Sequence, residues 1–112
     1  MQLAALVLLS ALARKKIGKS GLKTAEFFHG LAVSGRLGTE SLSAILSGLP
    51  DGVHEIKCHP GLETPALRQR YAWGYTWESE VAALRSSAIK QIVDRRGIRL
   101  RNFAEAWSNP SA

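Results

Sequence analysis

The chain has one cysteine, Cys58, and only four prolines among its 112 residues. A single cysteine excludes a disulfide within the chain, and Cys58 lies in an apolar strand pattern outside any paired-thiol motif. We therefore expect a reducing compartment and a cytoplasmic location. Aromatic residues are also scarce, at 7% of the chain, and they concentrate in the segment 71–77.

Long apolar runs are absent as well. The apolar run from Leu3 to Leu9 is interrupted by Ser10, and a membrane-spanning helix needs roughly 17–25 residues. No positive charge precedes the run and Arg14-Lys15-Lys16 follows it, which reverses the charge order of a secretory signal. We predict a buried helix and no transmembrane segment; a cryptic signal or anchor is the alternative.

Acidic residues are in deficit. Lys and Arg outnumber Asp and Glu by 15 to 9, which gives a net charge of +6. Ten of these positive charges form two groups of five beside apolar segments, at 14–23 and 90–101, as solvated helix ends and loops often do. A small basic nucleic-acid-binding module is the competing interpretation. The basic residues are dispersed and form no recognised binding motif, so no specific nucleic acid is expected.

Hydrophobic spacing and turn residues predict the secondary structure. We find no repeat, no low-complexity tract and no linker that would divide two domains. A final short strand or extended segment is expected around 98–103, and a flexible tail over 104–112. The other expected elements are a helix over 2–16 ended near Gly18, a strand within 22–31, a helix over 40–48 capped by Thr39, a strand over 53–59, and helices over 78–84 and 87–93.

The strand over 53–59 alternates between two faces. Ile56 and Cys58 point one way, whereas Glu55, Lys57 and His59 point the other. Helices that back the sheet would cover the apolar pair, leaving His59 on the side that a barrel would use as its lumen. The turn Pro60-Gly61 follows His59, so the histidine ends a strand, where α/β barrels present catalytic groups. Without further information, a turn-capping histidine that bonds nearby backbone is the simpler alternative.

Several short sequence motifs of the chain, called words below, resemble in their order the C-terminal part of the YdjC-like carbohydrate deacetylases. That family includes chitooligosaccharide deacetylase and the hopanoid-biosynthesis-associated deacetylases, and the Leu-Ala-x-Ser-Gly stretch at 31–35 looks closest to the second branch. The words are Gly21-Leu22-Lys23-Thr24-Ala25-Glu26-Phe27-Phe28, Gly30-Leu31-Ala32-Val33-Ser34-Gly35-Arg36-Leu37, Leu49-Pro50-Asp51-Gly52-Val53-His54-Glu55-Ile56-Lys57-Cys58-His59-Pro60-Gly61, Glu78-Ser79-Glu80-Val81-Ala82-Ala83-Leu84 and Gly97-Ile98-Arg99-Leu100.

This resemblance implies a hydrolase that removes acetyl groups from N-acetylated sugars on a distorted (βα) barrel and depends on a divalent metal, Mg or Zn. His59 matches the His-Pro-Gly histidine of the family, which implies a general acid for the leaving amine. The family's metal ligands, an Asp in an N-terminal Asp-Asp word and two upstream histidines, have no counterpart here. Glu26 is the nearest match to an Asp that the family often has at 24–28.

These departures suggest a truncated reading frame. The fold class is then α/β, with residues 1–112 a single partial domain that forms the C-terminal portion of the barrel. We expect such a chain to be inactive alone, with an acetylated amino sugar as substrate and a homo-oligomer possible. A non-catalytic interaction fragment of the same family is a further alternative.

Candidate substrate contacts surround His59 in this interpretation. Glu55 and Lys57 share its face and would tune its pKa or form a cross-strand ion pair. Trp73 and Tyr75 would stack on sugar rings, or else belong to a structural cover. No three-ligand metal set emerges from the remaining candidates, since His54 and His59 face opposite sides of the strand. We interpret His29 as a loop residue and His54 as a surface strand residue.

Overall fold

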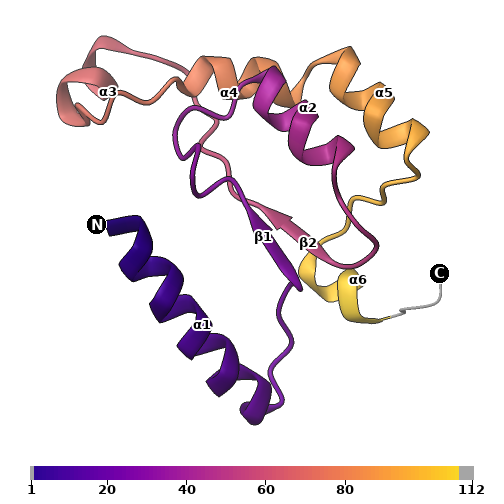
Figure 1. Cartoon of the computed structure of the whole chain (residues 1–112). Helices are drawn as coiled ribbons and strands as arrows, with labels where there is room; N and C mark the ends of the chain where they lie inside the picture. Colours follow the sequence, from indigo (N-terminus) through magenta and orange to yellow (C-terminus); the bar gives the residue numbers. More distant parts are fainter. Residues whose placement is uncertain (1, 109–112) are drawn as a thin grey trace. The chain divides into compact units, whose positions relative to one another are not determined.

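The computed structural model describes residues 2–108, which form helices and two short strands (Figure 1). By contacts, the described chain groups into two compact units, one spanning Phe27–Leu100 and the other made of the segments before and after it. In order, the elements are α1 (Gln2–Ser20), β1 (Phe27–His29), α2 (Thr39–Ser47), β2 (His54–Ile56), α3 (Pro65–Arg70), α4 (Trp77–Leu84), α5 (Ser87–Arg95) and α6 (Phe103–Ser108).

Strands β1 and β2 pair in parallel, with α2 as the connection between them. The register places Phe27 opposite His54 and His29 opposite Ile56. A parallel pair needs a crossover of this kind, because a tight hairpin can join only antiparallel strands. The structure therefore confirms the α/β class, and the two strands it describes do not make up a barrel.

Helices α2, α4 and α5 pack together and form the core of the 27–100 unit. The helical spacing that predicts α2 also identifies its buried side chains, Leu42 and Leu46. Burying one such leucine contributes about 1.5–3 kcal/mol. Ile56 and Cys58 pack against this cluster, which confirms the apolar face predicted for β2 and its continuation.

The N-terminus of α2 lacks the side-chain cap that the sequence predicts, whereas an arginine side chain caps its C-terminus. The helix begins at Thr39, so Gly38 is the N-cap and no side chain caps the first turn. At the other end, the guanidinium of Arg96 donates to the carbonyl oxygens of Ser47 and, at 2.6 Å, of Leu49. Arg96 thus satisfies carbonyl groups that a helix end leaves unpaired.

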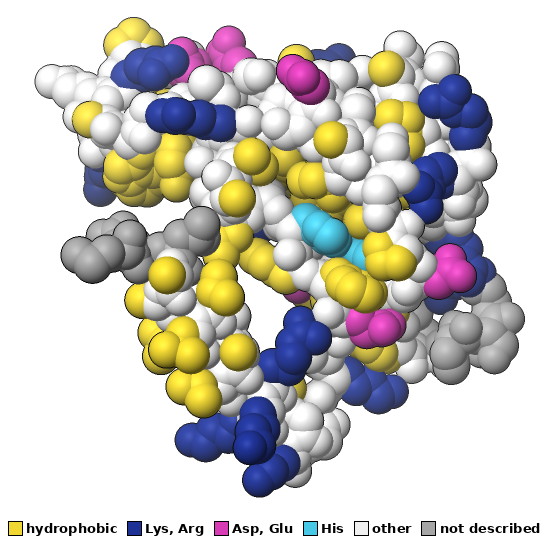
Figure 2. All heavy atoms as spheres, viewed as in Figure 1, with side chains coloured by type: hydrophobic (Ala, Val, Ile, Leu, Met, Phe, Trp, Pro, Cys, Tyr) yellow, Lys and Arg dark blue, Asp and Glu magenta, His cyan; other side chains and the backbone are white. Residues whose placement is uncertain are grey.

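Helix α1 confirms the predicted N-terminal helix, but the predicted burial is wrong. Leu8, Leu9 and Leu12 are each at least 60% exposed, and apolar side chains cover much of this helix in Figure 2. The helix continues through Gly18 and ends at Ser20, before Gly21, whose positive φ of 74° stops it. None of the helices described is both long enough and apolar enough to cross a membrane.

Two segments correct the predicted element boundaries. The segment after Gly61, predicted as a loop, contains α3, which begins at Pro65. Its N-cap is Thr64, whose hydroxyl accepts a hydrogen bond from the Leu67 N–H. Of the two alternatives predicted for 98–103, a short strand or an extended segment, the described structure lacks the strand, and Phe103 begins α6. This helix takes up the first part of the predicted tail, 104–112, of which 109–112 lie outside the described residues.

Candidate functional site

His59 follows the end of β2 and is fixed through its backbone. Its N–H donates to Oε2 of Glu80, and Oε1 of the same carboxylate accepts the N–H of Leu37 at 3.1 Å. Glu80 is only 1% exposed. A buried carboxylate is stable when its oxygens accept hydrogen bonds of this kind. Glu80 therefore joins α4, the start of the His-Pro-Gly turn and the loop before α2.

The imidazole ring of His59 lies against Tyr75, with 4.9 Å between ring centroids and 59° between ring planes. Its Nδ1 is buried and has no hydrogen-bond partner in the described part of the chain. The turn-capping alternative requires a bond from this ring to nearby backbone, and Nδ1 makes none. A buried imidazole nitrogen without a partner is uncommon in native proteins, so the His59 ring is a candidate functional group.

Four aromatic residues, Tyr71, Trp73, Tyr75 and Trp77, form a continuous series that we call the aromatic row. Successive ring centroids are 4.6, 5.4 and 6.0 Å apart, and all three pairs are tilted. Trp77 is buried in the first turn of α4, whereas Trp73 is 59% exposed. The row thus runs from the core to the surface, and Tyr75 connects it to His59.

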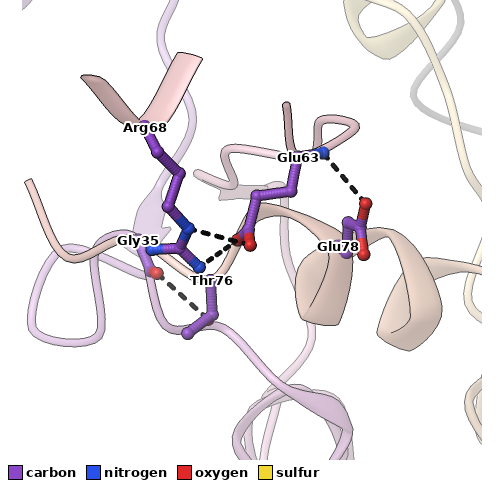
Figure 3. A network of polar contacts seen from close by, with 5 residues as sticks. All are labelled: Gly35, Glu63, Arg68, Thr76 and Glu78. Atoms are coloured by element: carbon purple, nitrogen blue, oxygen red, sulfur yellow. Dashed lines mark hydrogen bonds and ion pairs between the residues drawn. The ribbon is translucent and has the colours of Figure 1, made fainter. Parts of the chain in front are cut away.

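Hydrogen bonds hold the segments that flank this row (Figure 3). Both the backbone N–H and the hydroxyl of Thr76 donate to the carbonyl of Gly35, at 2.8 and 3.2 Å. Arg68 donates to the Glu63 carboxylate at 2.9 Å, and the Glu63 N–H donates to Glu78 at 3.0 Å. The Thr76 end of the loop is therefore tied to Gly35, and Glu63 links the segment before the aromatic row to α4.

Gly35 also fits the row sterically. Its φ is +77°, and a Cβ at this position would lie 2.2 Å from the ring of Tyr75. Only glycine combines this backbone conformation with such a close approach. The Gly-Arg word at 35–36 therefore has a local structural role, which is to let the Tyr75 ring pack on the backbone.

Glu55 and Lys57 do not behave as the cross-strand ion pair that was one alternative. Among the salt bridges of the described residues, none involves either side chain. The backbone of Lys57 donates instead to the carbonyl of His29 at 3.0 Å and extends the β1–β2 pairing by one residue. Both side chains are half-buried on the strand that leads to His59.

His29 and His54 form a pair that local sequence patterns do not predict. His29 is the last residue of β1, so its placement in a loop was wrong. Its Nε2 lies 3.0 Å from Nδ1 of His54, and Nε2 of His54 lies 2.9 Å from the carbonyl of Pro50. Because a carbonyl can only accept, His54 carries its proton on Nε2, and His29 donates to His54. Histidine side chains reach the surface over the sheet in Figure 2.

The geometry of this pair favours a hydrogen bond over a shared metal ion. The ring centroids are 5.2 Å apart and the planes differ by 26°, so the two close nitrogens lie nearly on the line between the rings. Two imidazoles that ligate one ion direct their lone pairs at that ion and not at each other. No group of three or more His, Cys, Asp or Glu side chains that could hold a metal comes together within residues 2–108. These residues do not fit a self-contained metal site.

The histidine pair predicts a pH-dependent stability. Partial burial, and then the charge of His54, lowers the pKa of His29 below its usual value. The unfolded chain therefore binds this proton more readily than the folded chain, so the contribution is present above about pH 6.5 and is lost as the pH falls. We expect urea titrations between pH 7 and 5 to show a declining free energy of unfolding. The decline should be shallower in His29→Asn, and an identical pH slope in that variant would contradict the prediction.

Cys58, the free thiol of the chain, lies on the packing side of the strand. Burial raises the pKa of the Cys58 thiol, and the charge of Glu80 adds to the rise. A thiol with a raised pKa is a poor nucleophile at neutral pH. This cysteine therefore packs against the core, and the pKa of its thiol depends in part on the charge of Glu80.

The fold and site define a small α/β unit in which a strand-end histidine is held by a buried glutamate beside an aromatic row. Comparison with protein families identifies the class to which this arrangement belongs. The model of the YdjC-like protein family matches residues 2–95, so the chain belongs to the YdjC-like family. No curated protein and no solved structure matches the chain. Family membership implies a carbohydrate-deacetylase-like function at the level of the family.

Proposed function

We propose that this chain supplies the leaving-group acid of a carbohydrate deacetylase, and that His59 is that acid. In the proposed reaction, water adds to the acetyl carbonyl of an N-acetylated sugar, and the C–N bond of the resulting intermediate breaks. The imidazolium of His59 gives its proton to the departing nitrogen, and the products are acetate and the free amino sugar. Chitooligosaccharides and glycosyl-hopanoid-type sugars are the substrate classes proposed.

One observation carries this proposal. The His59-Pro60-Gly61 word lies inside the family match over residues 2–95, and the structure has His59 just beyond the end of β2. Parallel strands of α/β enzymes present catalytic groups at their carboxyl ends. The hydrogen bond that the His59 N–H donates to Glu80 limits the movement of the His59 backbone, as a proton donor with a fixed position requires.

The proposal extends to parts of the enzyme that this chain does not show. A divalent metal, Mg or Zn, would polarise the amide carbonyl when bound, and the remaining strands of a distorted (βα) barrel would carry its ligands. Glu55, Lys57, Trp73 and Tyr75 are proposed substrate contacts, because the first two precede His59 on its strand and the last two belong to the aromatic row. A cytoplasmic location is proposed on the basis of the single free thiol.

The basic residues give less support to the nucleic-acid alternative. Arg96 caps α2, and Lys90 forms an ion pair with Asp94 at 2.8 Å. Arg101 donates to the carbonyl of Glu105 at 3.2 Å. Several charges of the 90–101 group thus have partners within the chain, and a solvated phosphate-binding strip would leave them free.

The acid role of His59 predicts a loss of turnover when the proton donor is removed. The chain alone, with Mg or Zn, is expected to release no acetate from N-acetylchitooligosaccharides. Mixed with the separately produced N-terminal part of a YdjC-like deacetylase, it should release acetate. His59→Ala and His59→Asn should then lower kcat by about 10²–10⁴-fold with little change in KM.

The asparagine variant is the matched test, because it keeps a planar polar side chain and lacks a proton to transfer. Unchanged kcat in His59→Asn would remove the acid role. Acetate release by the chain alone would contradict the proposed need for a second part.

A further inference from the structure

Trp73 offers an exposed ring whose position is already fixed. It is 59% exposed, and it is supported by Tyr71 at 4.6 Å and Tyr75 at 5.4 Å between ring centroids. The bonds from Thr76 to Gly35 hold the loop that carries it. A ligand that stacks on a pre-positioned ring loses less free energy to ordering than one that must immobilise a loop. The exposed indole is therefore suited to bind a flat or C–H-rich ring.

Guanidinium groups lie beside two neighbours of this exposed ring, Tyr71 and Gly74. Arg70 lies over the ring of Tyr71, with its central carbon 5.7 Å from the centroid. A terminal nitrogen of Arg36 lies 4.0 Å from where a Cβ on Gly74 would be. Arg68, the third arginine near the row, pairs with Glu63. In the salt bridges of residues 2–108, neither Arg36 nor Arg70 pairs with a carboxylate.

We propose that the aromatic row and these two arginines form a subsite for a sugar ring that carries a carboxylate. The C–H face of the pyranose would stack on Trp73, and Arg36 or Arg70 would bind the carboxylate. This inference rests on the proposed function, because Tyr75 links the row to His59. Among the N-acetylated sugars proposed as substrates, the subsite would favour those with an acidic sugar next to the N-acetylated sugar at His59, and neutral chitooligosaccharides would bind more weakly.

The structure favours a single sugar subsite over a groove for a nucleic-acid strand. Strand-binding proteins stack successive bases on several exposed aromatic side chains. Here Trp73 is exposed, whereas Tyr71 and Tyr75 are half-buried and Trp77 is 6% exposed. One exposed ring suits one bound ring.

The experiment is a tryptophan-fluorescence titration of the whole chain with three probes. These are a tetrasaccharide of alternating N-acetylglucosamine and glucuronate, neutral tetra-N-acetylchitotetraose, and an oligothymidylate. We expect the acidic tetrasaccharide to bind at least tenfold more tightly than the other two, with an affinity that falls as salt rises. Since Trp73 is itself a reporter, calorimetry should repeat the measurement on the variants.

Trp73→Ala should lower the affinity for the acidic tetrasaccharide at least tenfold. Trp107→Ala is the matched control, because Trp107 lies in α6 and stacks on Phe103, outside the row; it should bind as the parent chain does. Arg36→Gln and Arg70→Gln together should abolish the preference for the acidic sugar. Far-UV circular dichroism should show all variants folded, and a folded Trp73→Ala chain that binds normally would overturn the proposal.

Two other outcomes also overturn it. Equal binding of the neutral and acidic sugars would remove the role of the arginines, and tighter binding of oligothymidylate would favour the nucleic-acid class. The test separates this inference from the acid role of His59, because it measures binding and not acetate release. Acidic-sugar binding with normal turnover in His59→Asn would count against the acid role alone.

Discussion

Replacing Glu80 by alanine is expected to destabilise the 27–100 unit by about 2–6 kcal/mol, because two backbone donors would lose the carboxylate that accepts them. The carboxylate is buried and accepts the backbone N–H groups of Leu37 and His59. Alanine would leave both donors buried without a partner, at about 1–3 kcal/mol each. Small domains have only about 5–15 kcal/mol of stability in total. A shift of the urea midpoint should show the loss, and a change below about 1 kcal/mol would contradict it.

Glu80→Gln separates the charge from the volume. Glutamine keeps one acceptor, but its amide group presents a donor to one of the two N–H groups, so we expect a smaller loss of about 1–3 kcal/mol. Glu78→Gln is the matched control on the same helix. Glu78 is exposed and accepts one bond from Glu63, and its replacement should cost less than about 1 kcal/mol.

Cys58 gives this prediction a readout that a purely structural change would not move. The Glu80 charge contributes to the raised pKa of the Cys58 thiol, although burial is the larger cause. In Glu80→Gln the pH midpoint for alkylation of Cys58 should therefore move to lower pH. The same midpoint in a folded Glu80→Gln chain would show that the carboxylate does not act on the thiol. The chain has no other cysteine to confuse the assay.

Local periodicity predicted much of this unit. The apolar spacing predicted α2 over 40–48, and the structure has it at 39–47. The alternation in 53–59 correctly assigned Ile56 and Cys58 to the core. These predictions succeed because the side chain that faces the core follows from the repeat of the element itself.

The sequence of α4 contains a spacing that indicates the burial of Glu80. Trp77, Glu80 and Ala83 are three apart along α4, so the helix places them on one side, and all three are buried. An acidic residue between two apolar residues at this spacing predicts a buried carboxylate with partners. The identity of those partners, Leu37 and His59, depends on tertiary contacts that no local pattern contains.

The His29–His54 pair and α1 mark the limits of the same reasoning. The two histidines are far apart in sequence, and only the β1–β2 register brings them together. For α1, the apolar composition indicates that the helix suits burial, but composition does not specify a partner. The structure exposes Leu8, Leu9 and Leu12, so the helix was predictable and its environment was not.

Gly30→Ala is expected to be as damaging as the loss of Glu80. Gly30 follows β1, has φ of +91° and is buried, and an added Cβ would lie 2.3 Å from the carbonyl oxygen of Lys57. That oxygen belongs to backbone, so a side-chain rotation cannot relieve the clash. The strands would have to separate at the point where Lys57 donates to the carbonyl of His29. Alanine would also carry the strain of a positive φ, about 1–2 kcal/mol.

Gly97→Ala isolates the backbone strain from the clash. Gly97 has φ of +63°, ends α5 in the same unit, and has no atom within 4 Å of an added Cβ. We expect this control to cost about 1–2 kcal/mol, and Gly30→Ala to cost at least about 1–3 kcal/mol more, as overpacking does. Urea denaturation of both variants measures the difference, and equal losses would show that the strand ends move apart freely. Because β2 leads directly to His59, a larger loss in Gly30→Ala would show that close packing of the two strand ends stabilises the segment that carries the proposed acid.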